Sequence, residues 1–128
     1  MAKVKTVKGT RDILEKDFYF HDMIENIFEE HCLRLNFRKI STPIIEPSML
    51  FLRTLGDVSD IVSKEMYTFI DQGKESLTLR PEGTAPVARA LISNSLHEDQ
   101  NQKFFYSGPM FRRENPQAGR LRQFTQVG

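Results

Sequence analysis

The sequence predicts an α+β domain in which helices flank a mainly antiparallel sheet. Three patterns lead to this fold class: an amphipathic helical stretch near the start of the chain, strand-like runs with turn residues between them, and a second helical stretch further on. The resulting order of helix, strand, hairpin, helix and long hairpin is typical of an α+β domain.

The first 36 residues contain an arm and a long helix. Residues 1–11 are basic and polar and are interrupted by Gly9. Between Asp12 and Leu35 apolar residues recur every three or four positions, which predicts a helix. Asn36 is expected to end it, because Asn tolerates the left-handed backbone that ends helices. We expect the apolar stripe to pack in the core; it comprises Phe20, Met23, Ile24, Ile27, Phe28 and Cys32.

The next twenty residues are predicted to be extended and then helical. A short strand is expected over residues 37–42, closed by Pro43. Pro43 and Pro47 forbid a helix between them and favour extended chain. Residues 48–55 predict a short helix that Gly56 ends.

Two hairpins and a helix are expected in the second half. Residues 66–70 and 76–79 predict a first hairpin with Gly73 in its turn. Residues 84–95 predict a helix with Pro86 in its first turn. The long hairpin is expected to have strands over 103–114 and 121–127 and a loop over 115–119.

The composition is that of an ordinary globular chain. With 128 residues and 14.9 kDa, one domain is expected. Hydrophobic residues make up 39% and charged residues 27%, which argues against a disordered tail. No apolar run approaches the roughly 20 residues of a membrane-spanning helix, and the N-terminus lacks the apolar core of a secretory signal. No membrane partner is therefore expected.

Several kinds of catalytic centre are unsupported. A single cysteine, Cys32, excludes an internal disulfide framework and favours a reducing, cytoplasmic setting, with Cys32 an inert buried thiol. His21, His31 and His97 have no partners at metal-ligand spacing, so no metal site is predicted. The serine-hydrolase elbow, the Walker phosphate loop and the dinucleotide fingerprint are missing from the sequence.

The first unusual stretch is Leu79-Arg80-Pro81-Glu82-Gly83-Thr84. Arg80 and Glu82 flank a proline where a predicted strand meets a predicted helix. Such a junction is a natural ligand site, because free backbone N–H groups point out of the helix start. The alternative is that Glu82 is an ordinary acid of the first helical turn, stabilised by the helix macrodipole.

The second unusual stretch is the arginine-rich hairpin between Phe111 and Phe124. The net charge of the chain is only +1, yet this segment has four arginines against one acid, Glu114. Strand alternation places Arg112 and Glu114 on one face and Arg113 on the other. On the returning strand one face carries Arg122, Phe124 and Gln126, with Arg120 at the mouth of the strand.

This arrangement favours a ligand that combines a polyanion with a ring, such as ATP. Arginine suits phosphate because its planar fork makes bidentate bonds and stays charged. Phe124 is available to stack on a base. The alternative is a solvated, charged hairpin without a ligand.

Four stretches, in this order, resemble the N-terminal part of a histidyl-tRNA synthetase, a class II aminoacyl-tRNA synthetase. Lys8-Gly9-Thr10-Arg11-Asp12 resembles the opening of that family. Residues 15–46 resemble class II motif 1, and residues 78–84 resemble the histidine-binding segment. Residues 108–127 resemble motif 2, of the form Phe-Arg-x-Glu, loop, Arg-x-x-x-Phe.

The resemblance implies a role for each matching residue. On ATP, Arg112 would bind the α-phosphate, Glu114 the adenine amino group, Arg120 the γ-phosphate and Phe124 the adenine ring. On histidine, Arg112 would bind the carboxylate, Glu82 and Thr84 the amino group, and Gln126 would add a further contact. Pro43 would lie at the interface of a homodimer. Arg113 and Arg122 have less certain counterparts and are expected to give electrostatic support.

The implied reaction joins the histidine carboxylate to the α-phosphorus of ATP and then transfers the aminoacyl group to tRNA(His). Both reactants are anions, so charge neutralisation and positioning suffice without a protein nucleophile. Mg²⁺ is expected on the phosphates.

The family also has parts that this chain does not contain. Its motif 3 and its anticodon-binding domain lie beyond Gly128. We therefore expect a fragment of the class II fold, truncated after motif 2, that binds ligands weakly and catalyses poorly. Two alternatives stay open: a non-catalytic, synthetase-like regulatory subunit of ATP phosphoribosyltransferase, and a dimerisation module built on motif 1.

Overall fold

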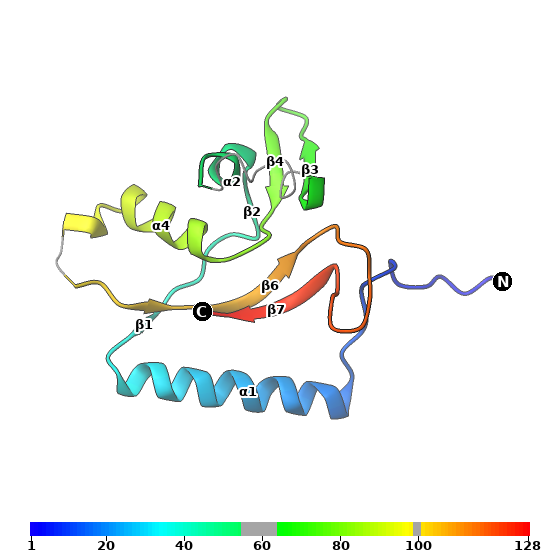
Figure 1. The fold of residues 1–128 in the computed structure, drawn as a ribbon, viewed down its shortest axis with the longest axis horizontal. Coiled ribbons are helices and arrows are strands. Elements are labelled where there is room, and N and C mark those ends of the chain that lie inside the picture. Colours follow the sequence, from blue (N-terminus) through cyan, green and yellow to red (C-terminus); the bar gives the residue numbers. More distant parts are fainter. Residues whose placement is uncertain (55–63, 99–100) are drawn as a thin grey trace.

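The structure is a computed structural model that describes residues 1–54, 64–98 and 101–128. The elements in chain order are α1 (Glu15–Arg34), β1 (Arg38–Lys39), β2 (Ile45–Pro47), α2 (Ser48–Thr54), β3 (Tyr67–Ile70), β4 (Ser76–Leu79), α4 (Thr84–Ser93), η2 (Leu96–Glu98), β5 (Phe104–Phe105), β6 (Ser107–Phe111) and β7 (Gln123–Val127). The β6–β7 hairpin lies in the middle of the molecule, between α1 on one side and α2, α4 and β2–β4 on the other (Figure 1).

The strands confirm the α+β class with mainly antiparallel pairing. Within the described ranges, β2, β4 and β3 form one antiparallel sheet in the order β2–β4–β3, and β6 pairs with β7 in another. The short β1 and β5 pair in parallel, with Arg38 opposite Phe104.

Helix α1 forms where the apolar period predicts it, beginning at Glu15 rather than Asp12. Asn36 follows the helix with a φ of +60°, so the predicted left-handed stop is confirmed. The prediction that the whole apolar stripe packs in the core is wrong. Cys32 is buried, but Ile24 and Ile27 are 57% and 62% exposed.

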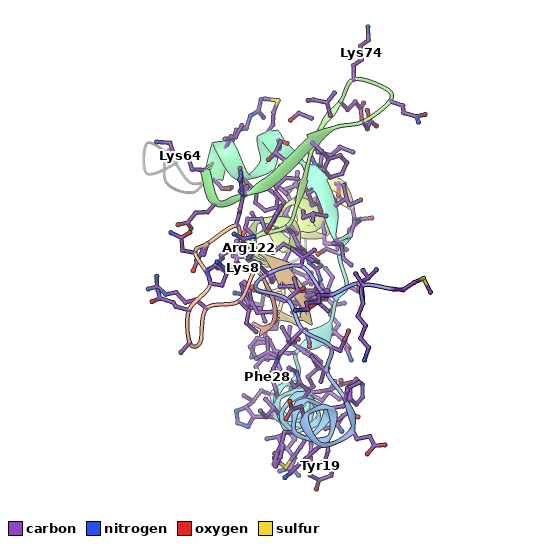
Figure 2. All side chains as sticks on the ribbon, turned by 90° about the vertical axis from the view of Figure 1, so that its right-hand side faces the viewer. Lys8, Tyr19, Phe28, Lys64, Lys74 and Arg122 are labelled. Carbon is purple, nitrogen blue, oxygen red and sulfur yellow. The ribbon has the colours of Figure 1, made fainter. Side chains whose placement is uncertain are left out.

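The reason is that α1 contacts the rest of the chain over a small area. The Phe28 ring meets the buried Phe105 ring edge-on, with centroids 6.0 Å apart. Figure 2 shows Phe28 on the side of α1 that faces the hairpin and Tyr19 on the opposite side. The described residues leave most of the stripe uncovered, including Phe20, Met23, Ile24 and Ile27.

Two predicted strands are shorter than expected. The strand expected over 37–42 contains only Arg38 and Lys39, because the segment pairs with the two-residue β5. The strand expected over 103–114 divides at Tyr106, where the chain changes partner from β1 to β7. Tyr106 and Gly128 exchange two backbone hydrogen bonds of 2.8 and 3.1 Å.

The remaining elements agree in kind and differ at their ends. In the long hairpin, the first strand ends at Phe111 rather than at residue 114, and β7 begins at Gln123 rather than at residue 121. Helix α2 begins at Ser48 as expected, and its predicted end at residues 55–56 lies outside the described residues. The β3–β4 hairpin is confirmed, but the left-handed position of its turn is Lys74, with φ +64°, and not Gly73. Helix α4 begins at Thr84 and ends at Ser93, two residues earlier than expected.

The small core lies where α2 and α4 cover the β2–β4–β3 sheet. Phe51, Met66 and Ala85 form a buried cluster, with Leu50 packed against it. A buried hydroxyl network joins Ser48 to Thr78 at 2.8 Å. This packing fixes the end of β4 and the start of α4 beside β6, which is where the candidate site lies (Figure 1).

Candidate functional site

The register of the β6–β7 hairpin decides which side chains face one another. Met110 pairs with Phe124 and Gly108 with Gln126, so Phe124 and Gln126 share a face, as alternation predicts. The backbone N–H of Arg112 donates to the carbonyl of Arg122 at 2.9 Å, which continues the same register beyond the end of β6.

A cavity of about 500 Å³ opens at the loop end of this hairpin. Its lining includes all four side chains that the sequence assigns to ATP: Arg112, Glu114, Arg120 and Phe124. It is completed by Gly119, Leu121 and Thr125. The cavity therefore combines two guanidinium groups, one carboxylate and one aromatic ring.

Arg112 lies at the centre of this arrangement. Its guanidinium carbon is 5.1 Å from the centroid of the Phe124 ring, which is a cation–π distance. Its Nε donates a 3.0 Å hydrogen bond to the carbonyl of Pro81. Arg112 thus connects the cavity to the segment between β4 and α4.

A second cluster forms where that segment meets β7. The side-chain carbonyl of Gln126 accepts a 3.0 Å hydrogen bond from the backbone N–H of Gly83. Because Gly83 lies between Glu82 and Thr84, the structure brings together the three further residues to which the family resemblance gives a contact with histidine. Thr84 is exposed, and Glu82 and Gln126 are half-buried.

Glu82 caps the N-terminus of α4. One carboxylate oxygen accepts from the N–H of Thr84 at 2.6 Å, and the other accepts from the N–H of Ala85 at 2.9 Å. These are two of the N–H groups that a helix start leaves without partners. Glu82 lies before the first turn of α4 rather than within it, but its carboxylate still stabilises the helix start, as the structural alternative expects.

Arg80, the other charged residue of this segment, is a structural residue. Only 6% of its surface is exposed. Its Nε donates to the carbonyl of Pro109 at 3.0 Å, and one terminal nitrogen donates to the carbonyl of Thr42 at 2.9 Å. Burial lowers the pKa of Arg80 below its ordinary value, while the charges of Glu46 and Tyr106 oppose that change.

Tyr106 is a site residue that sequence reasoning missed. Its hydroxyl donates to the side-chain carbonyl of Gln126 at 3.4 Å. Its side chain lies so close to Gly83 and Gly128 that a Cβ on either glycine would clash with it. No local pattern marks Tyr106, because both glycines are more than 20 residues away in the sequence.

The other predicted positions have different surroundings. Arg113 is exposed, and its backbone N–H donates to the carbonyl of Glu65. Arg122 donates from Nε to the carbonyl of Glu114 at 3.2 Å. Pro43 is exposed between β1 and β2 and does not line the cavity.

The described part of the chain contains neither a metal-ion cluster nor a membrane-spanning helix. Within residues 1–54, 64–98 and 101–128, no three His, Cys, Asp or Glu side chains lie close enough together to hold a metal ion. None of the helices in these same ranges has the length and apolar character needed to cross a membrane.

The chain matches a family model described as histidyl-tRNA synthetase over residues 9–128. It is 55% identical over 123 residues to the histidine–tRNA ligase of Anoxybacillus flavithermus, covering 94% of this chain and 29% of that protein. It is 51% identical over 128 residues to the histidine–tRNA ligase of Prochlorococcus marinus, covering 100% of this chain and 30% of that protein.

Two solved structures have a similar fold. Apo histidyl-tRNA synthetase of S. aureus superposes with a TM-score of 0.78 at 40% identity, over 98% of this chain and 28% of that one. A protein from Bacillus halodurans, described as an ATP phosphoribosyltransferase regulatory subunit/histidyl-tRNA synthetase, gives a TM-score of 0.78 at 26% identity, over 96% of this chain and 31% of that one. This chain therefore spans about 30% of the length of its relatives.

Proposed function

Because this chain belongs to the histidyl-tRNA synthetase family, we propose that it supplies part of the adenylation site of a histidine–tRNA ligase. Such an enzyme activates histidine with ATP and transfers it to tRNA(His). One observation carries the proposal. The cavity lined by Arg112, Glu114, Arg120 and Phe124 is joined to the Glu82–Gln126 cluster by a single hydrogen bond from Arg112 to Pro81.

In the proposed nucleotide site, ATP occupies the 500 Å³ cavity. The adenine ring stacks on Phe124, and the Glu114 carboxylate accepts from the adenine amino group. Arg112 binds the α-phosphate and Arg120 the γ-phosphate, since guanidinium groups match phosphate geometry. The Arg112 guanidinium lies 5.1 Å from the centroid of the Phe124 ring, so the groups proposed to bind the α-phosphate and the adenine ring are adjacent.

In the proposed amino-acid site, histidine lies beside the N-terminus of α4. Its amino group contacts Glu82 and Thr84, its carboxylate contacts Arg112, and Gln126 adds a further contact. The capping role of Glu82 is compatible with this. A carboxylate has about four acceptor positions, and the two N–H groups of α4 use two of them.

The proposed chemistry relies on charge neutralisation and positioning. The histidine carboxylate and the α-phosphate repel each other until a cation lies between them. Arg112 is suited to this task because its guanidinium lines the cavity and also bonds to Pro81, the residue before Glu82. Neither a nucleophile nor a general base is required, because the carboxylate attacks phosphorus directly and pyrophosphate departs.

A Mg²⁺ ion on the phosphates remains part of the proposal, and its ligands would be mainly phosphate oxygens. Glu114 is the only carboxylate lining the cavity, so the described residues do not form a metal cage of their own.

Homodimerisation, binding of tRNA(His) and a cytoplasmic location are also proposed, the last because Cys32 is a free, buried thiol. The boundaries of motif 1, the histidine-binding segment and motif 2 remain predictions.

Substitution of Arg112 tests this function in the complete enzyme. Arg112→Ala is expected to abolish histidine-dependent exchange of pyrophosphate into ATP, since removing a preorganised donor costs about 3 kcal/mol or more in the barrier. The control is Arg53→Ala, which removes an exposed arginine at the end of α2 and should leave the exchange rate within about twofold. A normal exchange rate in Arg112→Ala would contradict the assignment.

A dimerisation module is a second candidate, favoured by the exposed stripe on α1. Ile24, Ile27 and Pro43 are all exposed on the segment assigned to motif 1. A stable dimer of the 128-residue chain without measurable affinity for ATP or histidine in isothermal titration would favour this function. The regulatory-subunit alternative is disfavoured by the intact Glu82-Gly83-Thr84 segment and the intact arginines of motif 2.

A further inference from the structure

The N-terminal arm is attached to the arginine-rich loop. The backbone N–H of Arg122 donates to the carbonyl of Gly9 at 2.7 Å. Figure 1 shows the arm crossing the loop that joins β6 to β7, and Figure 2 shows Lys8 beside Arg122. This contact joins the first residues of the chain to some of its last ones.

A turn holds the Gly9 carbonyl in place. The N–H of Thr10 donates to the carbonyl of Val7 at 2.9 Å, and the Thr10 hydroxyl donates to the same carbonyl at 2.7 Å. Gly9 has a φ of +83°, a conformation that residues with a Cβ rarely adopt. The turn therefore depends both on glycine at position 9 and on the hydroxyl at position 10.

The turn fits against the loop without spare room. A Cβ on Gly9 would lie 2.8 Å from Cγ of Arg122 and 3.0 Å from Cγ of Pro116. Because Pro116 belongs to the loop, the turn touches it as well as the start of the returning strand. Any larger residue at position 9 must move one of these neighbours.

Arg122 passes this restraint on to the cavity. Its backbone carbonyl accepts from the N–H of Arg112 at 2.9 Å, and its Nε donates to the carbonyl of Glu114 at 3.2 Å. Both Arg112 and Glu114 line the 500 Å³ cavity. Two successive hydrogen bonds, both through Arg122, therefore connect Gly9 to the backbone of Arg112 and to the backbone of Glu114.

We propose that the turn at Val7–Thr10 is a positioning element of the nucleotide site. It holds the loop between Arg112 and Arg122 in the conformation that binds a nucleoside triphosphate. The benefit to binding rests on the proposed function, because it requires that this cavity receives ATP. Holding the loop in its bound conformation lowers the entropy that ligand binding must remove.

Amide hydrogen exchange of the 128-residue chain tests the attachment directly. In Gly9→Ala, the amides of Arg112 and Arg122 are expected to exchange at least about tenfold faster, because their bonds open more often. The amides of β4 serve as the internal reference and should not change. The matched variant is Gly73→Ala, where the new Cβ would be 3.3 Å from the Asp71 carboxylate and far in sequence from the loop.

A milder pair of variants guards against misfolding of Gly9→Ala. Thr10→Val removes the hydroxyl bond to Val7 at nearly constant volume, whereas Thr10→Ser retains it. Thr10→Val should accelerate exchange at Arg122, and Thr10→Ser should restore the wild-type rate. Equal rates in both variants would contradict the role of the turn.

Titration with ATP and with histidine separates this inference from the proposed function. Gly9→Ala is expected to weaken ATP binding about tenfold and to leave histidine affinity within about twofold. Faster exchange with unchanged ATP affinity would overturn the positioning role. If the wild-type chain binds no ATP, the proposed nucleotide site is wrong for this chain. Independently of ATP, an unchanged exchange rate at the Arg122 amide in Gly9→Ala would overturn the attachment of the arm to the loop.

Discussion

Arg80 is a single residue that joins three segments of the chain. Its guanidinium bonds reach Thr42 before β2 and Pro109 in β6, while its own backbone follows β4. Its backbone N–H also donates to the carbonyl of Ile44, and its carbonyl accepts from Phe111. The edge of one sheet is thereby fixed to the hairpin that carries the candidate site.

Replacing Arg80 is expected to lower stability strongly. Arg80→Ala leaves the half-buried carbonyls of Thr42 and Pro109 without these donors and should reduce the free energy of unfolding by about 3 kcal/mol. Urea denaturation followed by circular dichroism measures the change. Arg53→Ala, which removes an exposed arginine at the end of α2, should stay within about 0.5 kcal/mol. Equal effects of the two changes would contradict this role.

The side chains of the Phe111–Phe124 hairpin were easier to predict from the sequence than the roles of Arg80 and Tyr106. Strand alternation, a local property, was enough to place Phe124 and Gln126 on one face. The assignment of Arg112, Glu114, Arg120 and Phe124 to one ligand came from the family resemblance, because Arg122 and Gln126 share the Phe124 face without lining the cavity. The roles of Arg80 and Tyr106 were not predictable in this way. Their partners, such as Thr42 and Gly128, are brought to them only by the folded chain.

At the scale of elements, α4 depends on the residue in front of it. Gly83 occupies the cap position and has no side chain to accept a hydrogen bond, so Glu82 accepts from the first two N–H groups instead. The negative charge also interacts favourably with the positive end of the helix. Glu82 is thus a structural part of α4 as well as a proposed ligand.

Glu82→Ala is therefore expected to destabilise the chain even without ligand. The expected loss is about 1 kcal/mol, the usual cost of a lost helix cap, measured as a shift of the urea midpoint. Glu82→Gln keeps an oxygen acceptor and should lose less. An unchanged midpoint in Glu82→Ala would contradict the capping role and leave only the proposed contact with histidine.

Element positions were predicted better than element lengths. Helices begin and end close to their expected residues because capping and period are local signals, as at Asn36. Strand lengths depend on the partner strand. Only two residues of the segment after α1 pair as a strand, because its partner β5 has only two residues. The sequence of the segment itself does not reveal the length of its partner.

At the scale of the whole molecule, the main departure from expectation is the apolar stripe of α1. The prediction that this stripe packs in the core is wrong, because the described chain does not provide enough surface to cover it. Exposed contiguous apolar surface of this kind marks an interaction site in soluble proteins. The proposed homodimer would bury it.

A charge introduced into this stripe tests the dimer. Ile27→Glu is expected to weaken self-association of the chain at least about tenfold in analytical ultracentrifugation, because a carboxylate would be buried without a partner. Ile92→Glu is the matched control, since Ile92 is 67% exposed on α4, away from the stripe. A monomeric wild-type chain, or equal effects of the two variants, would contradict the proposal.

The parallel pair of β1 and β5 has a consequence for the order of folding. Phe104 lies 66 residues after its partner Arg38, whereas the strands of the β3–β4 and β6–β7 hairpins are close neighbours in sequence. Closing a long loop costs more conformational entropy than closing a hairpin, and non-local contacts slow folding. We expect both hairpins to form early and α1 to dock last, when β5 becomes available to β1. The helix with the exposed stripe would then stay free longest and could meet a second chain before it docks.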